Sequence, residues 1–242
     1  MGVHSQLFKL GRNAATVNEA AASHEHRSWV LAGRRLTLPP WRTLGIVVAA
    51  VVTVALLGTG AWFWNATQQQ RGSEAYAAAL ARHRAADAPQ ATPEARMAAM
   101  SDLERVLAEY PSNVMAPQAA FLLGNLRFAA GQYDRARAAY QVTSARAGAG
   151  TMTTLARADI GYAWEAERKL PEAAQAFESA LSGLTPGSFY YEELLFDLAR
   201  VQERADKKDA ALATYRRILK ELPKSARAPE VKARLASLGA TP

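Results

Sequence analysis

The chain has 242 residues, half of them hydrophobic, with no cysteine and a formal net charge of +7. The lack of cysteine excludes disulfides, thiolate metal ligands, cysteine nucleophiles and a lipidated N-terminal cysteine. Residues 1–42 hold six basic and two acidic side chains, which leaves 23 basic and 20 acidic ones for the remainder. No helix-turn-helix, finger or RNP pattern accompanies this basic segment, so we expect no nucleic-acid binding.

Residues 1–40 mix polar, alanine and glycine residues without a sustained period and end in two prolines. This composition predicts a disordered basic tail. His24 and His26 form a His-x-His pair within it. Two ligands without a third do not make a metal site, so we expect a solvated tail and no bound metal.

Residues 43–64 form a stretch of 22 residues without a charge. As a helix it is about 33 Å long, enough to cross the hydrocarbon core of a membrane. Trp41 stands before it and Trp62, Phe63 and Trp64 end it, as aromatic residues do at membrane interfaces. We therefore predict a transmembrane helix at 41–64 that contacts the lipid bilayer through 43–64.

The basic residues before this segment favour a cytoplasmic N-terminus and a C-terminal domain on the periplasmic side of a bacterial inner membrane. A buried core helix is a weaker interpretation, because every face of the segment is apolar. A cleaved signal peptide is the main alternative, with an apolar region at 44–57 and small residues at 59–61. The segment 1–42 is long for the region that precedes the apolar part of a signal peptide, so we favour a retained anchor.

After a polar run at 65–73, which we interpret as a linker, the pattern is helical to the end of the chain. The fold class is therefore all-α, with one domain over 74–242. The expected helices lie at about 74–87, 93–109, 117–130, 133–146, 152–168, 171–181, 189–205, 208–221 and 229–238. Thr92 is the expected N-cap of the second, with Pro93 at its first position.

An internal repeat organises these helices. A small residue recurs one helical turn before a large one at nearly constant intervals along the chain, in the pairs Ala99/Leu103, Ala136/Tyr140, Ala173/Phe177 and Ala211/Tyr215. A second small position precedes each of the later three pairs at an equivalent place, at Gly124, Gly161 and Ala199. Such residues allow two helices to approach closely, and prolines such as Pro111 and Pro223 end each copy.

This pattern resembles the tetratricopeptide repeat (TPR), an antiparallel helix pair whose copies stack into a right-handed superhelix. It implies about three clear repeats after a degenerate first helix pair, with the last helix as a cap. The segments 110–120 and 222–231, which begin Tyr-Pro-Ser-Asn and Leu-Pro-Lys-Ser, are similar to joints in bacterial envelope TPR proteins. With the anchor, they resemble single-pass inner-membrane proteins of the YfgM type, the ancillary subunit of the Sec translocon.

The resemblance implies that the first helix of each repeat lines a concave face where peptides or partner helices dock. The positions expected to form this partner-binding groove are Phe121, Asn125, Phe128, Tyr162, Glu165, Phe196 and Arg200. The alternative for the three phenylalanines is packing between helices. The lysine and asparagine clamp for a C-terminal carboxylate is not matched, since only Asn125 stands at one of its positions.

We expect no enzyme and no cofactor. Residues 65–242 contain one histidine, His83, and no glycine-rich phosphate loop or Gly-x-Ser-x-Gly motif. Glu165 and Glu167 lie two apart on a helix and so point in different directions.

Three functional hypotheses follow. The first is a membrane-anchored scaffold whose periplasmic TPR domain binds other proteins, assisting translocation or envelope chaperone assembly. The second is a secreted periplasmic adaptor of the cell-division or Tol-Pal type, with the anchor removed as a signal. The third is a receptor-like protein whose basic tail recruits cytoplasmic or nucleic-acid partners.

Overall fold

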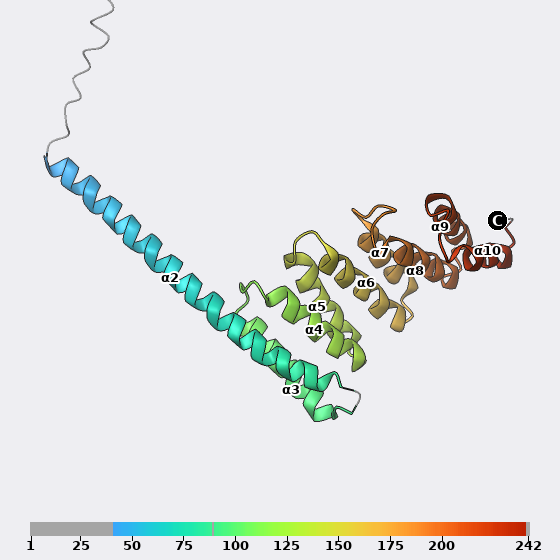
Figure 1. Cartoon of the computed structure of the whole chain (residues 1–242), viewed down its shortest axis with the longest axis horizontal. Coiled ribbons are helices and arrows are strands. Elements are labelled where there is room, and N and C mark those ends of the chain that lie inside the picture. Colours follow the sequence, from blue (N-terminus) through green and yellow to red (C-terminus); the bar gives the residue numbers. More distant parts are fainter. Residues whose placement is uncertain (1–40, 89, 241–242) are drawn as a thin grey trace, which may run out of the picture. The chain divides into compact units, whose positions relative to one another are not determined.

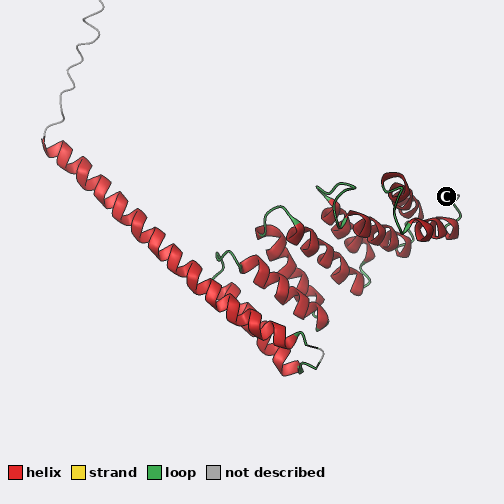
Figure 2. Ribbon diagram, in the orientation of Figure 1, coloured by secondary structure: helices red, strands yellow, loops and turns green. Residues whose placement is uncertain are grey.

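The computed structural model describes residues 41–88 and 90–240, and all of the secondary structure in these ranges is helical (Figure 1 and Figure 2). The predicted tail at 1–40, with His24 and His26, lies outside the described residues. The helices are α2 (Trp41–Ala86), α3 (Pro93–Glu109), α4 (Ala116–Ala129), α5 (Tyr133–Arg146), α6 (Thr151–Ala166), α7 (Leu170–Leu181), α8 (Tyr191–Arg204), α9 (Lys208–Glu221) and α10 (Ala228–Ser237). The all-α fold class is thus confirmed.

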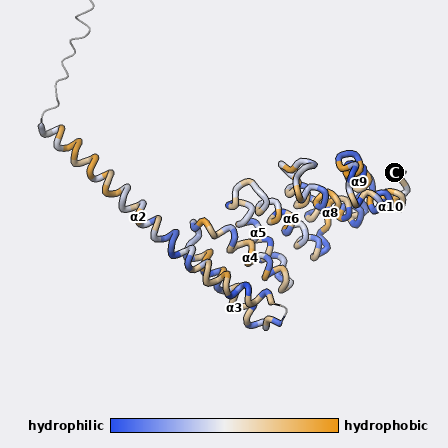
Figure 3. The backbone as a smooth tube through the Cα atoms, viewed as in Figure 1, coloured by the Kyte–Doolittle hydropathy of each residue, from blue (hydrophilic) through white to orange (hydrophobic). Residues whose placement is uncertain are grey.

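The chain forms two compact units, residues 1–60 and 61–242, and each is described by itself. The described part of the first unit is the N-terminal part of α2, which is apolar along its length (Figure 3). No residue of its most apolar window is buried, so the interpretation as a buried core helix is wrong. Among the described residues this is the one helix long and apolar enough to cross a membrane.

The polar run 65–73 is helical and belongs to α2, where we expected a linker. Glutamine and arginine are good helix formers, and the run contains no proline, so polarity alone does not end the helix. The α3–α4 loop also docks on it: Asn113 Nδ2 donates to the Gln69 carbonyl at 2.7 Å, and Gln69 Nε2 donates to the Ser112 carbonyl at 2.9 Å. A Cβ on Gly72 would lie 2.5 Å from Asn113 Nδ2, so glycine allows this close approach.

The second unit is a chain of antiparallel helix pairs. Each of the helices α3 to α10 packs against the next one in sequence, and α3 packs back along the end of α2 through a shared apolar cluster (Figure 1). The predicted helix ends agree with the structure to within two positions from α3 onward. Thr92 is the N-cap of α3, where its hydroxyl accepts from the Ala95 amide at 3.2 Å, with Pro93 directly after it.

The repeated small positions lie at the helix contacts. All four alanines of the predicted pairs are fully buried, and the large side chains paired with them are at most 2% exposed. The second small position faces the aromatic ring of the same repeat. A Cβ on Gly124 would lie 2.6 Å from Tyr140 Cδ1, and one on Gly161 would lie 2.9 Å from Phe177 Cε1. The repeat therefore pairs a small residue on the first helix with a ring on the second.

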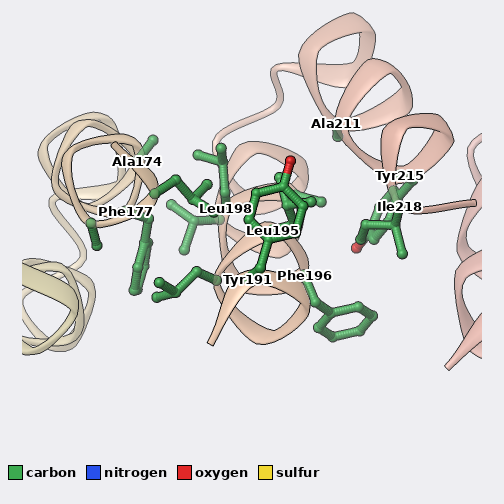
Figure 4. Close-up of a cluster of buried hydrophobic side chains, with 14 of the residues drawn as sticks. Ala174, Phe177, Tyr191, Leu195, Phe196, Leu198, Ala211, Tyr215 and Ile218 are labelled. Carbon is green, nitrogen blue, oxygen red and sulfur yellow. The ribbon is translucent and has the colours of Figure 1, made fainter. Parts of the chain in front are cut away.

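The largest apolar core lies in the C-terminal part of this unit and joins helices α6 to α10. Figure 4 shows Leu195 and Leu198 of α8 between Phe177 of α7 and Tyr215 of α9. Val231 and Leu235 of α10 close this core and are fully buried, which suits a helix that caps the array. A second core joins the end of α2 to α3, α4 and α5.

Candidate functional site: the central pocket

A pocket of about 630 Å³ lies where α4, α5, α6 and α8 meet, and we call it the central pocket. It is lined by Asn125 and Phe128 of α4, Tyr140 of α5, Asp159, Tyr162, Glu165 and Ala166 of α6, Arg168 just after α6, and Arg204 of α8. Its volume falls within the usual range of ligand sites, which combine apolar walls with a few polar groups.

Four of the seven groove residues predicted from the sequence line this pocket: Asn125, Phe128, Tyr162 and Glu165. They come from two successive first helices, as the repeat pattern implies. Phe128 is half-buried, and its ring meets that of Tyr133 edge-on, with centroids 5.3 Å apart. Asn125 Oδ1 accepts a hydrogen bond from the hydroxyl of Tyr140, with 2.9 Å between the two oxygens. The amide nitrogen of Asn125 takes no part in this bond and stays available for a ligand.

Arg200 lies beside the pocket and is held by carboxylates. Its Nη2 lies 3.0 Å from Glu165 Oε2 and 2.9 Å from Asp197 Oδ1, so it ties α8 to α6. The hydrogen bonds to Glu165, the strongest influence, raise the pKa of Arg200 further above its usual value. Tyr162 joins the same network by donating to Asp197 Oδ2 at 2.5 Å. Arg200 therefore links α8 to α6, a structural role that the sequence did not predict.

Phe121 and Phe196 do not line the pocket. Phe121 is half-buried against Tyr140, with ring centroids 5.8 Å apart. Phe196 is 7% exposed, packs on Tyr215 at 6.0 Å and is covered by the guanidinium of Arg227. The structure thus places both rings between helices, in keeping with the packing alternative.

Four polar or aromatic lining residues were missing from the predicted set: Tyr140, Asp159, Arg168 and Arg204. Helical spacing could have indicated two of them. Asp159 lies one turn before Tyr162 on the same face, and Arg204 lies one turn after Arg200. Tyr140 was recognised only as a core residue, because a ring that is 2% exposed can still present an edge to a cavity.

Asp159 differs from the other charged groups of the pocket. Glu165 is paired with both Arg200 and Arg204. Asp159 is half-buried and forms no hydrogen bond or ion pair within the described residues. Burial raises the pKa of its carboxyl from 3.8 to about 6. Its charge also adds to burial in raising the pKa of Tyr140.

The pocket combines aromatic rings with amide and carboxylate groups. Within residues 41–88 and 90–240, no group of three or more histidine, aspartate or glutamate side chains is arranged to hold a metal ion. The pocket offers aromatic faces, an amide nitrogen and one carboxylate that has no partner in the part of the chain that the structure describes. Groups of these kinds are common in sites that bind polar or charged ligands.

Comparison with protein families finds a match to the tetratricopeptide repeat-like domain over residues 40–240. A search of curated proteins finds no match. Among solved structures, the apo form of RapI aligns with a TM-score of 0.56 at 14% identity, over 72% of this chain and 49% of RapI. The chain thus spans about half the length of RapI, and at this identity the likeness concerns the fold alone.

Two further structures align less closely. MamA from Desulfovibrio magneticus RS-1, from its residue 41 to the end, gives a TM-score of 0.43 at 19% identity, covering 54% of this chain and 68% of that one. A thermophilic TPR protein of Thermus thermophilus gives 0.29 at 18% identity, covering 71% and 97%. The fold comparison therefore rests on RapI.

Proposed function

Because this chain belongs to the tetratricopeptide repeat-like domain family, whose fold serves as a scaffold for protein–protein interaction, we propose that it binds other proteins through the central pocket and the first-helix face around it. The scaffold is anchored in the bacterial inner membrane by residues 43–64 and exposes residues 65–242 to the periplasm. Its role is to assist protein translocation or envelope chaperone assembly, as in proteins of the YfgM type.

The single observation that supports the binding surface is the convergence of lining residues. Three first helices, α4, α6 and α8, contribute side chains to one open pocket, although these helices are far apart in the sequence. A pocket formed across successive repeats suits an extended peptide or a partner helix that runs along the array. We include Asn125, Phe128, Tyr162 and Glu165 as contact residues, with Arg200 and Phe121 beside them.

The exposure of α2 supports the anchor. Val47, Val51, Val54 and Leu57 are each more than half exposed along the apolar part of the helix. A continuous apolar surface of this size is costly in water and is covered by lipid in membrane proteins. In the sequence, Trp41 and Trp64 flank this stretch, as aromatic residues flank a membrane span.

Photocrosslinking in native membranes tests the binding surface. A photoreactive amino acid replaces Phe128, and the matched control carries it at Glu178, an exposed position on second helix α7. We expect discrete protein adducts from position 128 that are absent from position 178, with mass spectrometry identifying the partner. Equal capture from both positions, or none from position 128, contradicts the proposed surface.

Topology and processing need a separate measurement. The intact mass of the protein from purified membranes distinguishes a retained anchor from a cleaved signal, since cleavage removes the segment 1–61. We expect the full-length mass, and a protease added after permeabilising the outer membrane should digest the region beyond position 65 while sparing the tail. A shortened mass supports the secreted adaptor, and a protected C-terminal domain places the scaffold in the cytoplasm.

A further inference from the structure

The central pocket contains a half-buried carboxylate, Asp159, that forms no ion pair with any residue the structure describes. A carboxylate removed from water is stabilised by hydrogen bonds or a positive charge, and Asp159 has neither among the described residues. The hydroxyl of Tyr140 donates to Asn125 Oδ1 instead, and the hydroxyl of Tyr162 donates to Asp197. The missing interaction is therefore one that a bound molecule can supply.

An internal comparison shows which group is missing. Asp197 stands at the position of its repeat that Asp159 occupies in the previous repeat. One turn after Asp197 comes Arg200, whose guanidinium pairs with that carboxylate at 2.9 Å. One turn after Asp159 comes Tyr162, which carries no charge at neutral pH. The chain thus supplies a cation to the aspartate of one repeat and leaves the equivalent aspartate of the previous repeat open to the pocket.

The walls around Asp159 suit a long basic side chain. Phe128, Tyr140 and Tyr162 line the pocket with aromatic rings. Lysine and arginine bury their aliphatic stems against such surfaces, and their charged ends are attracted to ring faces as well as to carboxylates. The pocket is open to solvent, so a side chain can enter while the backbone of the partner stays outside.

The two arginines of the pocket oppose such a ligand only weakly. Arg204 is paired with Glu165, and Arg168 is exposed after the end of α6. Charges at exposed positions are screened by water and salt, whereas the charge of the half-buried Asp159 is screened less. An acidic side chain attracted to Arg168 and Arg204 would also have to lie near Asp159, at a cost in like-charge repulsion.

We infer that the central pocket binds a lysine or arginine side chain of an extended partner segment, with Asp159 as its counter-ion and Phe128, Tyr140 and Tyr162 as its walls. This inference rests on the proposed scaffold function and specifies that the partner residue bound in the pocket is positively charged. It assigns the pocket a ligand opposite in charge to the C-terminal carboxylate held by clamp-type TPR domains.

Peptide arrays test the ligand with the full-length protein in detergent micelles. The peptides have capped ends, random flanks and a central residue fixed as lysine, arginine, acetyl-lysine, glutamine, leucine or glutamate. We expect peptides centred on lysine or arginine to be retained at least about tenfold better than the other four, because only they place a cation beside the half-buried carboxylate of Asp159. Acetylation removes the charge and keeps the stem, so its effect isolates the ion pair without altering the protein.

Variants then locate the preference. Asp159→Asn should abolish the preference for peptides with a basic central residue, because it removes the counter-ion. Tyr162→Arg should also abolish it, because the new arginine can pair with Asp159 as Arg200 pairs with Asp197. Asp159→Glu should keep most of it. Glu178→Gln is the matched control, because it removes the same charge from an exposed site on α7 and should change nothing.

The outcomes separate this inference from the proposed function. The same peptides are also presented to the protein that carries the photoreactive amino acid at position 128, so that crosslinking reports binding at the pocket. Peptides that crosslink there without a preference for a basic central residue, or with a preference that survives acetylation or Asp159→Asn, overturn the cation pocket and leave the scaffold in place. A preference for glutamate also overturns it. If no peptide crosslinks to position 128, both proposals fail.

Discussion

The C-terminal repeat, formed by α8 and α9, and the repeat formed by α4 and α5 share one helical register but differ in the size of the apolar core around their rings. In the C-terminal repeat Phe196 packs against Tyr215, and the surrounding core is large and apolar. One repeat earlier, Ala158 stands where the C-terminal repeat has Phe196. Among the residues that the structure describes, the core around Tyr140 of α5 has two other buried members, Ala136 and Ala156, and the pocket opens beside it.

This difference shows that stability and recognition are divided along the array. In repeat proteins each unit contacts mainly its neighbours, so a weakly packed repeat is tolerated between well-packed ones. The C-terminal core supplies apolar burial, whereas the repeat of α4 and α5 has a small core around Tyr140 and borders a pocket with polar groups. The following predictions test this division, beginning with the largest expected effect.

Truncation of the C-terminal core should be the most damaging change. Leu195 is fully buried in the largest cluster, so Leu195→Ala should lower the free energy of unfolding by about 2–5 kcal/mol. Phe189→Ala is the control, because Phe189 is 89% exposed and its loss should change stability by about 0.5 kcal/mol or less. Urea denaturation followed by circular dichroism measures both, and similar effects would refute the division.

Overpacking at a repeat contact should cost less. Ala173 is fully buried where α7 meets the first helix of its repeat, so Ala173→Leu should destabilise by about 1–3 kcal/mol. Gln175→Leu is the control, because it introduces the same side chain on the exposed face of the same helix and should leave the melting temperature nearly unchanged. An unchanged melting temperature for Ala173→Leu as well would mean that the helix contact accepts a larger group.

Asp159→Asn should raise stability at pH 7, by about 1–2 kcal/mol after allowance for its partial exposure. The pKa of Asp159 is about 6 in the folded protein, against an ordinary value of 3.8 for an exposed aspartate. As the pH falls, Asp159 therefore takes up its proton at a higher pH in the folded state than in the unfolded state. Protonation of this group therefore increases the stability of the wild type as the pH falls from about 7 to about 4. The difference in melting temperature between wild type and variant should shrink from pH 7 to pH 5, and a constant difference would contradict the shifted pKa.

The smallest effect concerns the small positions opposite the rings. Gly124→Ala places a Cβ against Tyr140, and the cost of overpacking is partly offset by the better helix propensity of alanine, which leaves a net loss of about 1 kcal/mol. Ala199 stands at the equivalent position of the C-terminal repeat and is fully buried, so Ala199→Gly should also destabilise, by about 0.5–1 kcal/mol through helix propensity alone. Thermal melts of both variants measure these losses, and a gain in stability for Gly124→Ala would show that the ring moves freely.

Some of the candidate site could be predicted from the sequence and some could not. Helical spacing placed Asn125, Phe128, Tyr162 and Glu165 on the inner sides of their helices, and the structure brings them to one pocket. The same spacing pointed to Arg200 equally, yet its guanidinium is occupied by Glu165 of another helix. Spacing within one helix carries no information about which side chains of a different helix will pair.

The sequence by itself determined the helices, their ends and the repeat register, because periodic apolar positions, prolines and caps act over short distances along the chain. It also determined that 43–64 is apolar enough to cross a membrane. Only the tertiary structure decided that α2 continues through 65–73, since the loop that docks there lies beyond α3 in the sequence. It alone decided that Asp197 has a cation and that Asp159 has none among the described residues, because that depends on how α6 and α8 place their side chains in space.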